Sequence, residues 1–122
     1  MKGIESVGLF TENAERLAKF YKEKVGLKLQ KHRMADMDEK LFYVEGKGAS
    51  FFIMDHSKVR GKNKQPERII FNFEVNDIKS SVKKLEKTKV KKIADAYNVS
   101  GYGWIATFQD IDGNYFQLVQ LE

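Results

Sequence analysis

Apolar and polar positions follow the same order twice along the chain, at an offset of 64 residues. Residues 3–10 alternate as a half-buried strand, and residues 68–75 form a second, more apolar strand. A capping residue, Asn13 or Asp77, follows each strand, and apolar positions at helical spacing come next. Three short strand-like runs separated by turn residues complete each half. The pattern therefore predicts two copies of one strand–helix–three-strand module.

The elements after each helix are short. Gly26 is expected to end the first helix, and residues 110–114 to form a turn between two strands. Residues 57–67 are charged and hold the only proline, so they are interpreted as a linker. The predicted short strands are 27–33, 40–46 and 49–55 in the first half and 90–97, 103–109 and 115–121 in the second. We expect a single domain, 1–122, made of modules 1–56 and 68–122.

Composition excludes several classes of protein. The 122 residues are 42% hydrophobic, which is enough for a packed core. No apolar run approaches the roughly 20 residues that span a bilayer, and the N-terminus has no signal-peptide pattern. We therefore predict a cytoplasmic protein without a membrane partner. The absence of cysteine excludes disulfides, thiol nucleophiles and cysteine-based metal sites.

Positive charge gathers on the second predicted helix. The net charge is +5, and Lys79, Lys83 and Lys87 recur at every fourth residue. Such spacing is typical of a solvated helical face, and no aromatic residues are interleaved as in a nucleic-acid-binding module. The pattern favours a solvated face over a nucleic-acid site.

Three segments, GLFTENAERLAKFY, FNFEVNDIKSSVKKL and FQDIDGNYFQLVQ, resemble the vicinal oxygen chelate superfamily, which includes glyoxalase I, bleomycin-resistance proteins and extradiol dioxygenases. The last segment is similar to the family's Asp-Pro-Asp-Gly-Asn turn, with Ile111 replacing proline. The resemblance implies an α+β, glyoxalase-like fold. Two paired βαβββ modules would form an open, cup-shaped, eight-stranded sheet around a cleft. It also implies a homodimer.

Alternation along each strand then separates helix-facing from cleft-facing side chains. An aromatic cleft with a few polar groups would suit a small molecule; the alternative is that side chains fill the cup as ordinary core. By this parity Asp55, Glu74 and Val119 also face the cleft, as does Gly8. The expected ligand-binding residues are Ser6, Phe10, Phe51, Ile53, Ile70, Asn72, Trp104, Tyr115 and Gln117.

The resemblance also identifies where metal-dependent relatives place their His or Glu ligands. Those positions fall on Ser6, Ile53, Ile70 and Gln117, which cannot provide the imidazole or carboxylate set that a divalent ion needs. We therefore expect no metal and no cofactor. His32 and His56 are interpreted as ordinary edge residues, because neither has ligand spacing.

Three functions remain open. The first is a metal-independent protein that binds a small aromatic or planar, neutral or anionic molecule; the charge of +5 disfavours a cationic drug. The second is an isomerase- or lyase-type enzyme with a noncanonical site: either an unusual metal site or Glu74 as general acid or base. The role of Glu74 requires that it be enclosed rather than at a solvated strand end. The third is a structural or partner-binding domain whose cup is filled.

Overall fold

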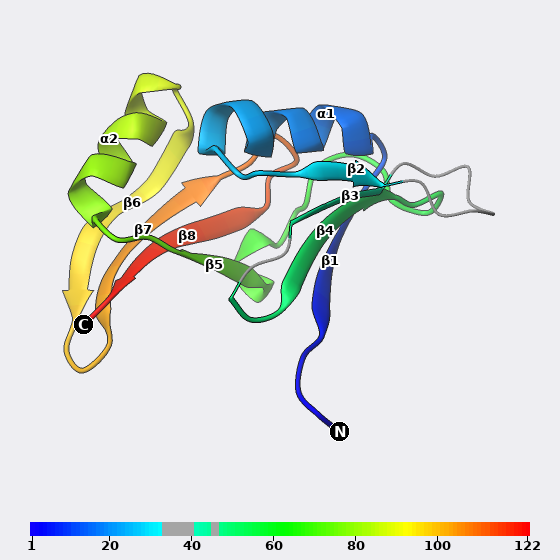
Figure 1. Ribbon diagram of the computed structural model, residues 1–122. Coiled ribbons are helices and arrows are strands. Elements are labelled where there is room, and N and C mark those ends of the chain that lie inside the picture. The colour runs from blue at the N-terminus through cyan, green and yellow to red at the C-terminus, as the bar shows by residue number, and fades with distance from the viewer. Residues whose placement is uncertain (33–40, 45–46) are drawn as a thin grey trace. The chain divides into compact units, whose positions relative to one another are not determined.

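The computed structural model describes residues 1–32, 41–44 and 47–122. The chain divides into two compact units, Met1–Gly61 and Lys62–Glu122 (Figure 1). In each unit a strand, a helix and three further strands follow one another, so the predicted module is confirmed in both halves. The described residues form two four-stranded mixed sheets, eight strands in all, in an α+β fold.

The sheet of the first unit has the strand order β1-β4-β3-β2. β1 and β4 pair in parallel, and the other neighbours are antiparallel. The helix between β1 and β2 packs on one face of this sheet and continues through a wider turn. The elements are β1 (Ser6–Thr11), α1 (Ala14–Phe20), the wider turn η1 (Tyr21–Val25), β2 (Gln30–His32), β3 (Leu41–Val44) and β4 (Ser50–Asp55).

The sheet of the second unit repeats this topology with the order β5-β8-β7-β6. β5 and β8 are parallel, and α2 packs against β6, β7 and β8. A short 3-10 helix lies at the end of the predicted linker, 57–67, and includes the first residue of the strand predicted at 68–75. The elements are η2 (Pro66–Arg68), β5 (Ile70–Glu74), α2 (Ile78–Lys87), β6 (Lys91–Val99), β7 (Gly103–Gln109) and β8 (Tyr115–Leu121).

The predicted helix boundaries are confirmed by hydrogen bonds at the helix starts. The side chain of Asn13 accepts a bond from the Arg16 N–H at 3.0 Å, and that of Asp77 accepts one from Ser80 at 3.2 Å. Gly26 ends the helical region of the first unit with a φ of 91°. Polar side chains thus satisfy backbone donors that a helix start leaves unpaired.

Each helix packs its apolar face on one side of its own sheet, and aromatic rings fill the space. In the first unit Leu17 and Tyr21 are fully buried. In the second unit Phe108 and Phe116 stack with ring centroids 5.9 Å apart and have no exposed surface. No helix in the described part of the chain is both long and apolar enough to cross a membrane.

Candidate functional site

The face of each sheet opposite its helix, called here the helix-free face, is identified by strand register. Register partners in a parallel pair place their side chains on the same face. In the first unit the helix-facing pairs are Val7 with Phe51 and Leu9 with Ile53. The helix-free face of the first sheet is therefore formed by Ser6, Gly8, Phe10, Ser50, Phe52 and Met54.

The face predicted for β4 is wrong: the residues expected to face the cleft face the helix instead. The Phe51 ring packs against Tyr21 of the helical region at a centroid distance of 6.0 Å. Asp55 accepts a hydrogen bond from the Ala14 N–H at 2.7 Å. Ile53, which lies between Phe51 and Asp55 and points to the same face, is fully buried. Phe51, Ile53 and Asp55 thus face the helix.

The cause is a shift in the repeat. Ser6 corresponds to Ile70 at an offset of 64, but their register partners, Ser50 and Tyr115, lie 65 residues apart. The second unit therefore gains one residue before its last strand. As a result Phe52, rather than Ile53, corresponds to Gln117.

An aromatic cluster occupies the helix-free face of the first sheet. Phe10 meets Phe52 edge-to-face with centroids 5.8 Å apart, and it meets His56 in the same way at 5.4 Å. Gly8 leaves room for the Phe52 ring, because a Cβ at Gly8 would lie only 2.3 Å from the tip of that ring. Phe10 keeps 41% of its surface exposed. The sequence prediction included Phe10 but missed Phe52 as its partner.

The helix-free face of the second sheet is more polar. Its residues on the parallel pair are Ile70, Asn72, Glu74, Tyr115, Gln117 and Val119, as the parity predicted. The Gln117 amide donates a hydrogen bond to the Thr107 hydroxyl on the adjacent strand at 3.0 Å. This bond fixes the orientation of the amide group.

Trp104 does not belong to either helix-free face. It pairs across the strands with Gln120, whose side-chain oxygen accepts a bond from the Ile78 N–H at the start of α2. Trp104 therefore lies on the helix-facing side of the second sheet, where it is 41% exposed near the strand's start. The expectation that Trp104 lines the cleft is wrong, because alternation places its neighbours Gly103 and Ile105 on the other face.

With the register of β4 taken into account, the positions that correspond to the metal ligands of metal-dependent relatives are Ser6, Phe52, Ile70 and Gln117. Two of them are hydrocarbon, one is a hydroxyl and one is an amide already bonded to Thr107. This set does not fit a divalent ion, which needs imidazole or carboxylate donors. Among the described residues no group of three or more His, Cys, Asp or Glu side chains is arranged to hold an ion.

The remaining candidates do not converge. Glu74 is exposed at the last position of β5, as the solvated alternative requires. The Nδ1 atom of His56 accepts a hydrogen bond from the Lys58 N–H at 3.1 Å. The side chain of His32 lies outside the described residues.

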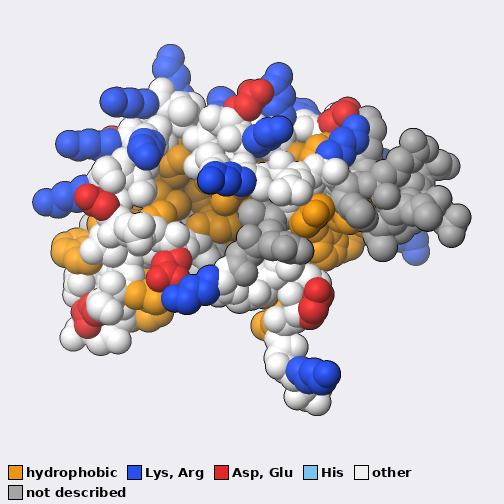
Figure 2. All heavy atoms as spheres, in the orientation of Figure 1, with side chains coloured by type: hydrophobic (Ala, Val, Ile, Leu, Met, Phe, Trp, Pro, Cys, Tyr) orange, Lys and Arg blue, Asp and Glu red, His pale blue; other side chains and the backbone are white. Residues whose placement is uncertain are grey.

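Basic side chains gather over α2 (Figure 2). Lys79, Lys83, Lys84 and Lys87 are all exposed. Near them Lys92 of β6 bonds to Glu86 and Asp95, and these hydrogen bonds, Asp95 first, raise the pKa of Lys92 above its usual value. The lysines of α2 thus have the exposure that a solvated face requires.

Comparison with known proteins identifies the family. A sequence model of the Glyoxalase/Bleomycin resistance protein/Dioxygenase superfamily matches residues 3–118. The chain belongs to this superfamily. The match spans both units and agrees with the repeated βαβββ topology described above.

Three relatives illustrate the range of this superfamily. The uncharacterized protein YetH of Bacillus subtilis (strain 168) is 25% identical over 118 residues, which cover 97% of this chain and 98% of YetH. The antibiotic binding protein TnmS3 of Streptomyces sp. CB03234 is 20% identical with a TM-score of 0.72, covering 100% and 98% of the two chains. Glyoxalase I of Leishmania major is 21% identical with a TM-score of 0.72, covering 98% and 87%. The two structures share the fold.

Proposed function

We propose that this protein binds a small aromatic or planar, neutral or anionic molecule without a metal, and that the helix-free face of the first sheet holds its planar part. The observation that supports this proposal is the cluster of Phe10, Phe52 and His56. Edge-to-face packing orients the Phe10 ring, yet 41% of Phe10 stays exposed. A ring already held in place loses little freedom when a second planar group packs on it.

The second unit, taken by itself, also carries oriented hydrogen-bonding groups on its helix-free face. Asn72 and Gln117 are register partners on its helix-free face, and the bond to Thr107 holds the Gln117 amide. Small-molecule sites commonly combine apolar and aromatic surface with a few oriented polar groups. The helix-free face of the second unit thus carries, on its own, polar groups of the kind that such sites use.

The charge of the chain narrows the ligand class. A net charge of +5 disfavours a cationic molecule and favours an anion. The positions that correspond to metal ligands in relatives hold Phe52 and Ile70, which supports binding through packing and hydrogen bonds rather than through an ion. We also expect a homodimer, as the family resemblance implies.

Binding is favoured over catalysis by the placement of Glu74. A carboxyl that acts as general acid or base at neutral pH usually needs enclosure or a charged neighbour to tune it. Glu74 is exposed at a strand end. The TnmS3 structure is described as an antibiotic binding protein, so the fold supports a binding function in that relative.

The proposal is tested with matched probes and backbone NMR spectra. Naphthoate is planar and anionic, cyclohexanecarboxylate is not planar, and naphthylmethylammonium reverses the charge. We expect naphthoate to bind most tightly and to shift amide signals of β1 and β4. Phe10→Ala should weaken this binding about fivefold, the equivalent of about 1 kcal/mol for a lost ring contact.

Tyr102→Ala is the control, because Tyr102 is an equally exposed ring (40%) in a turn of the second unit. It should leave naphthoate binding unchanged. Equal effects of the two substitutions, or no shifts in β1 and β4, would contradict the proposed face. Native mass spectrometry of untagged protein purified without chelator checks the proposal that binding needs no metal. One retained metal ion per chain would overturn it.

A further inference from the structure

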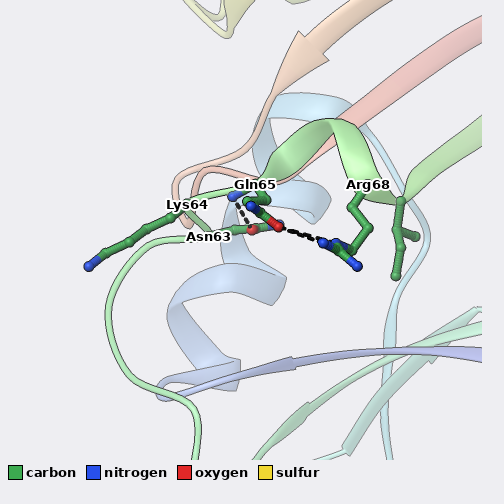
Figure 3. Close-up of a pocket in the computed structure, with 5 residues that line it drawn as sticks. Asn63, Lys64, Gln65 and Arg68 are labelled. Atoms are coloured by element: carbon green, nitrogen blue, oxygen red, sulfur yellow. Dashed lines mark hydrogen bonds between the residues drawn. The ribbon is translucent and has the colours of Figure 1, made fainter.

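A hollow of about 370 Å³ lies in the second unit, just before β5 (Figure 3). Its lining residues all come from one short segment, residues 63–69: Asn63, Lys64, Gln65, Arg68 and Ile69. The volume is at the lower end of the roughly 300–1,000 Å³ of small-molecule sites. These residues take no part in the aromatic cluster or in the helix-free face of the second sheet.

Asn63, which lines this hollow, is hydrogen-bonded to the turn between β7 and β8. The backbone N–H of Asn63 donates to the Asp112 carbonyl at 2.7 Å, and its side-chain amide donates to Asn114 Oδ1 at 3.0 Å. The Asn63 side-chain oxygen accepts a bond from the Gln65 N–H at 2.9 Å. Asp110 in turn accepts bonds from the backbone of Asp112 and Asn114. This chain of bonds holds residues 63–65 in one conformation.

The guanidinium of Arg68 is oriented by a neutral partner. Its Nε and Nη2 atoms both donate to Gln65 Oε1, at 3.2 and 2.8 Å (Figure 3). The described residues place no carboxylate within ion-pair distance of Arg68, so its charge is not compensated. The edge formed by Nη1 and Nη2 retains donors for a second acceptor, because the guanidinium carries five N–H groups in a planar fork.

Charge at this hollow comes from Arg68 rather than from both basic residues. The Lys64 side chain extends away from Arg68 (Figure 3). Ile69, the next residue after Arg68, is 63% exposed, so its hydrocarbon side chain is uncovered. A planar cation and an uncovered hydrocarbon therefore lie on the same short segment.

We propose that this hollow binds the carboxylate or phosphate group of a small organic anion, with Arg68 pairing the oxyanion and Ile69 contacting the hydrocarbon beside it. Two parallel N–H···O bonds from one guanidinium edge match both oxyanions. Gln65 holds the fork in place beforehand, which reduces the entropy lost on binding. The site is independent of the proposed function, because the two share no residue.

The experiment follows backbone amide signals of the whole chain at low salt during titration with benzoate and with phenyl phosphate. Acetate and inorganic phosphate are the matched probes without a ring. We expect saturable shifts at residues 63–69, with each aryl anion binding more tightly than its matched probe. Arg68→Gln should weaken binding by about tenfold or more, since a charge-assisted bidentate pair is lost.

Arg60→Gln is the control, because Arg60 is also exposed and bonds only to the Val59 carbonyl among the described residues. It should bind like the wild type. Equal loss in both variants, or shifts spread over the lysines of α2, would overturn the proposal in favour of general attraction to a basic protein. Equal affinity for acetate and benzoate would overturn the role of Ile69. Arg68→Lys keeps the charge but not the fork, so full binding by that variant would overturn the bidentate geometry.

Discussion

In both units a side chain from the last strand accepts a hydrogen bond from the first residue of the helix. Asp55 does so for Ala14, and Gln120 does so for Ile78. An ion pair between an edge strand and the helix also recurs, Lys31 with Glu15 and Lys92 with Glu86. The two units therefore hold their helices against their sheets by the same kinds of contact.

The helix-free faces differ in chemistry. Phe10 and Phe52 make the first face aromatic, whereas Asn72, Gln117 and Thr107 make the second one polar. The contacts that build the scaffold match between the copies, and the side chains that a ligand would meet do not. This contrast separates positions whose loss should lower stability from positions whose loss should change binding.

The largest expected effect is on the neighbours Phe51 and Phe52, which lie on opposite faces of β4. Phe51→Ala should lower the free energy of unfolding by about 3–5 kcal/mol, because it removes a buried ring that packs on Tyr21. Phe52→Ala should lower it less and should weaken naphthoate binding. Chemical denaturation and the probe titration check the two results.

Phe42 tests the same assignment from the adjacent strand. It pairs with Ile53 on the helix-facing side and is half-buried. Phe42→Ala should therefore lower stability without changing probe binding. If it changed binding as much as Phe52→Ala does, the division of the first sheet into two faces would be incorrect.

Two glycines give the next comparison. A Cβ at Gly103 would lie 2.1 Å from the Gln120 backbone carbonyl oxygen, and its φ of 148° disfavours other residues. At Gly8 the obstacle is the Phe52 ring, which can rotate away. Gly103→Ala should cost about 3 kcal/mol or more, from strain and overlap together. Gly8→Ala should cost about 1–2 kcal/mol and disturb the aromatic cluster.

Thermal unfolding and the amide signals of β1 and β4 distinguish the two glycine variants. Gly8→Ala is expected to shift the signals around Phe10 while the second unit keeps its spectrum. Gly103→Ala is expected to destabilise without altering the first unit's aromatic signals. A milder effect at Gly103 than at Gly8 would contradict this ranking.

Much of the scaffold could be predicted from the sequence because its signals are local. Asn13 and Asp77 are capping residues at the right distance from an apolar periodicity, and both cap their helices. The turn at residues 110–114 and the parity of β5 were also predicted correctly. These features depend on neighbouring residues alone.

The face of β4 could not be predicted in this way. Its sequence, SFFIMD, places large apolar residues on both faces, so the alternation of apolar and polar residues does not distinguish the two faces. The orientation depends on a one-residue shift between the copies, which only the strand register shows. A usable signal was Asp55, since an acidic side chain suits the start of a helix. Alternation within β7 also does not tell which face Trp104 occupies, because only its pairing with Gln120 and the bond of Gln120 to Ile78 assign that face.

The helix-start contacts allow a direct comparison of the two units. Asp55→Ala leaves the N–H of fully buried Ala14 without its acceptor, and removes a carboxylate from the positive end of α1. We expect a loss of about 1–3 kcal/mol. Gln120→Ala removes a neutral acceptor from Ile78 and should cost about 0.5–1.5 kcal/mol.

Denaturation curves of the two variants measure this difference, and Asp55→Asn separates its two causes. The asparagine keeps an oxygen acceptor but not the charge, so it should restore part of the stability lost in Asp55→Ala. Complete restoration would show that the charge contributes nothing at the helix start. Equal losses of stability in Asp55→Ala and Gln120→Ala would show that the charged and the neutral acceptor stabilise the two helix starts equally.

The smallest effect concerns the two ion pairs between edge strand and helix. Lys92 lies 2.9 Å from Glu86 and also bonds to Asp95, whereas Lys31 lies 3.7 Å from Glu15. Because its partners raise the pKa of Lys92 above 10.5, its stabilising contribution is complete below pH 10.5 and is lost as the pH rises through the raised value. Lys92→Met should therefore be less stable than the wild type at neutral pH, with the difference shrinking at higher pH.

Lys91→Met provides the matched control, since Lys91 is the exposed neighbour on the opposite face of β6. Surface pairs contribute little and are screened by salt, so both measurements belong at low ionic strength. We expect Lys92→Met to differ from Lys91→Met at neutral pH and to approach it above pH 10.5. Lys31→Met should lower stability at neutral pH less than Lys92→Met does, because the contact of Lys31 with Glu15 is longer. If Lys31→Met and Lys92→Met lowered stability equally, the shorter contact in the second unit would have no energetic consequence.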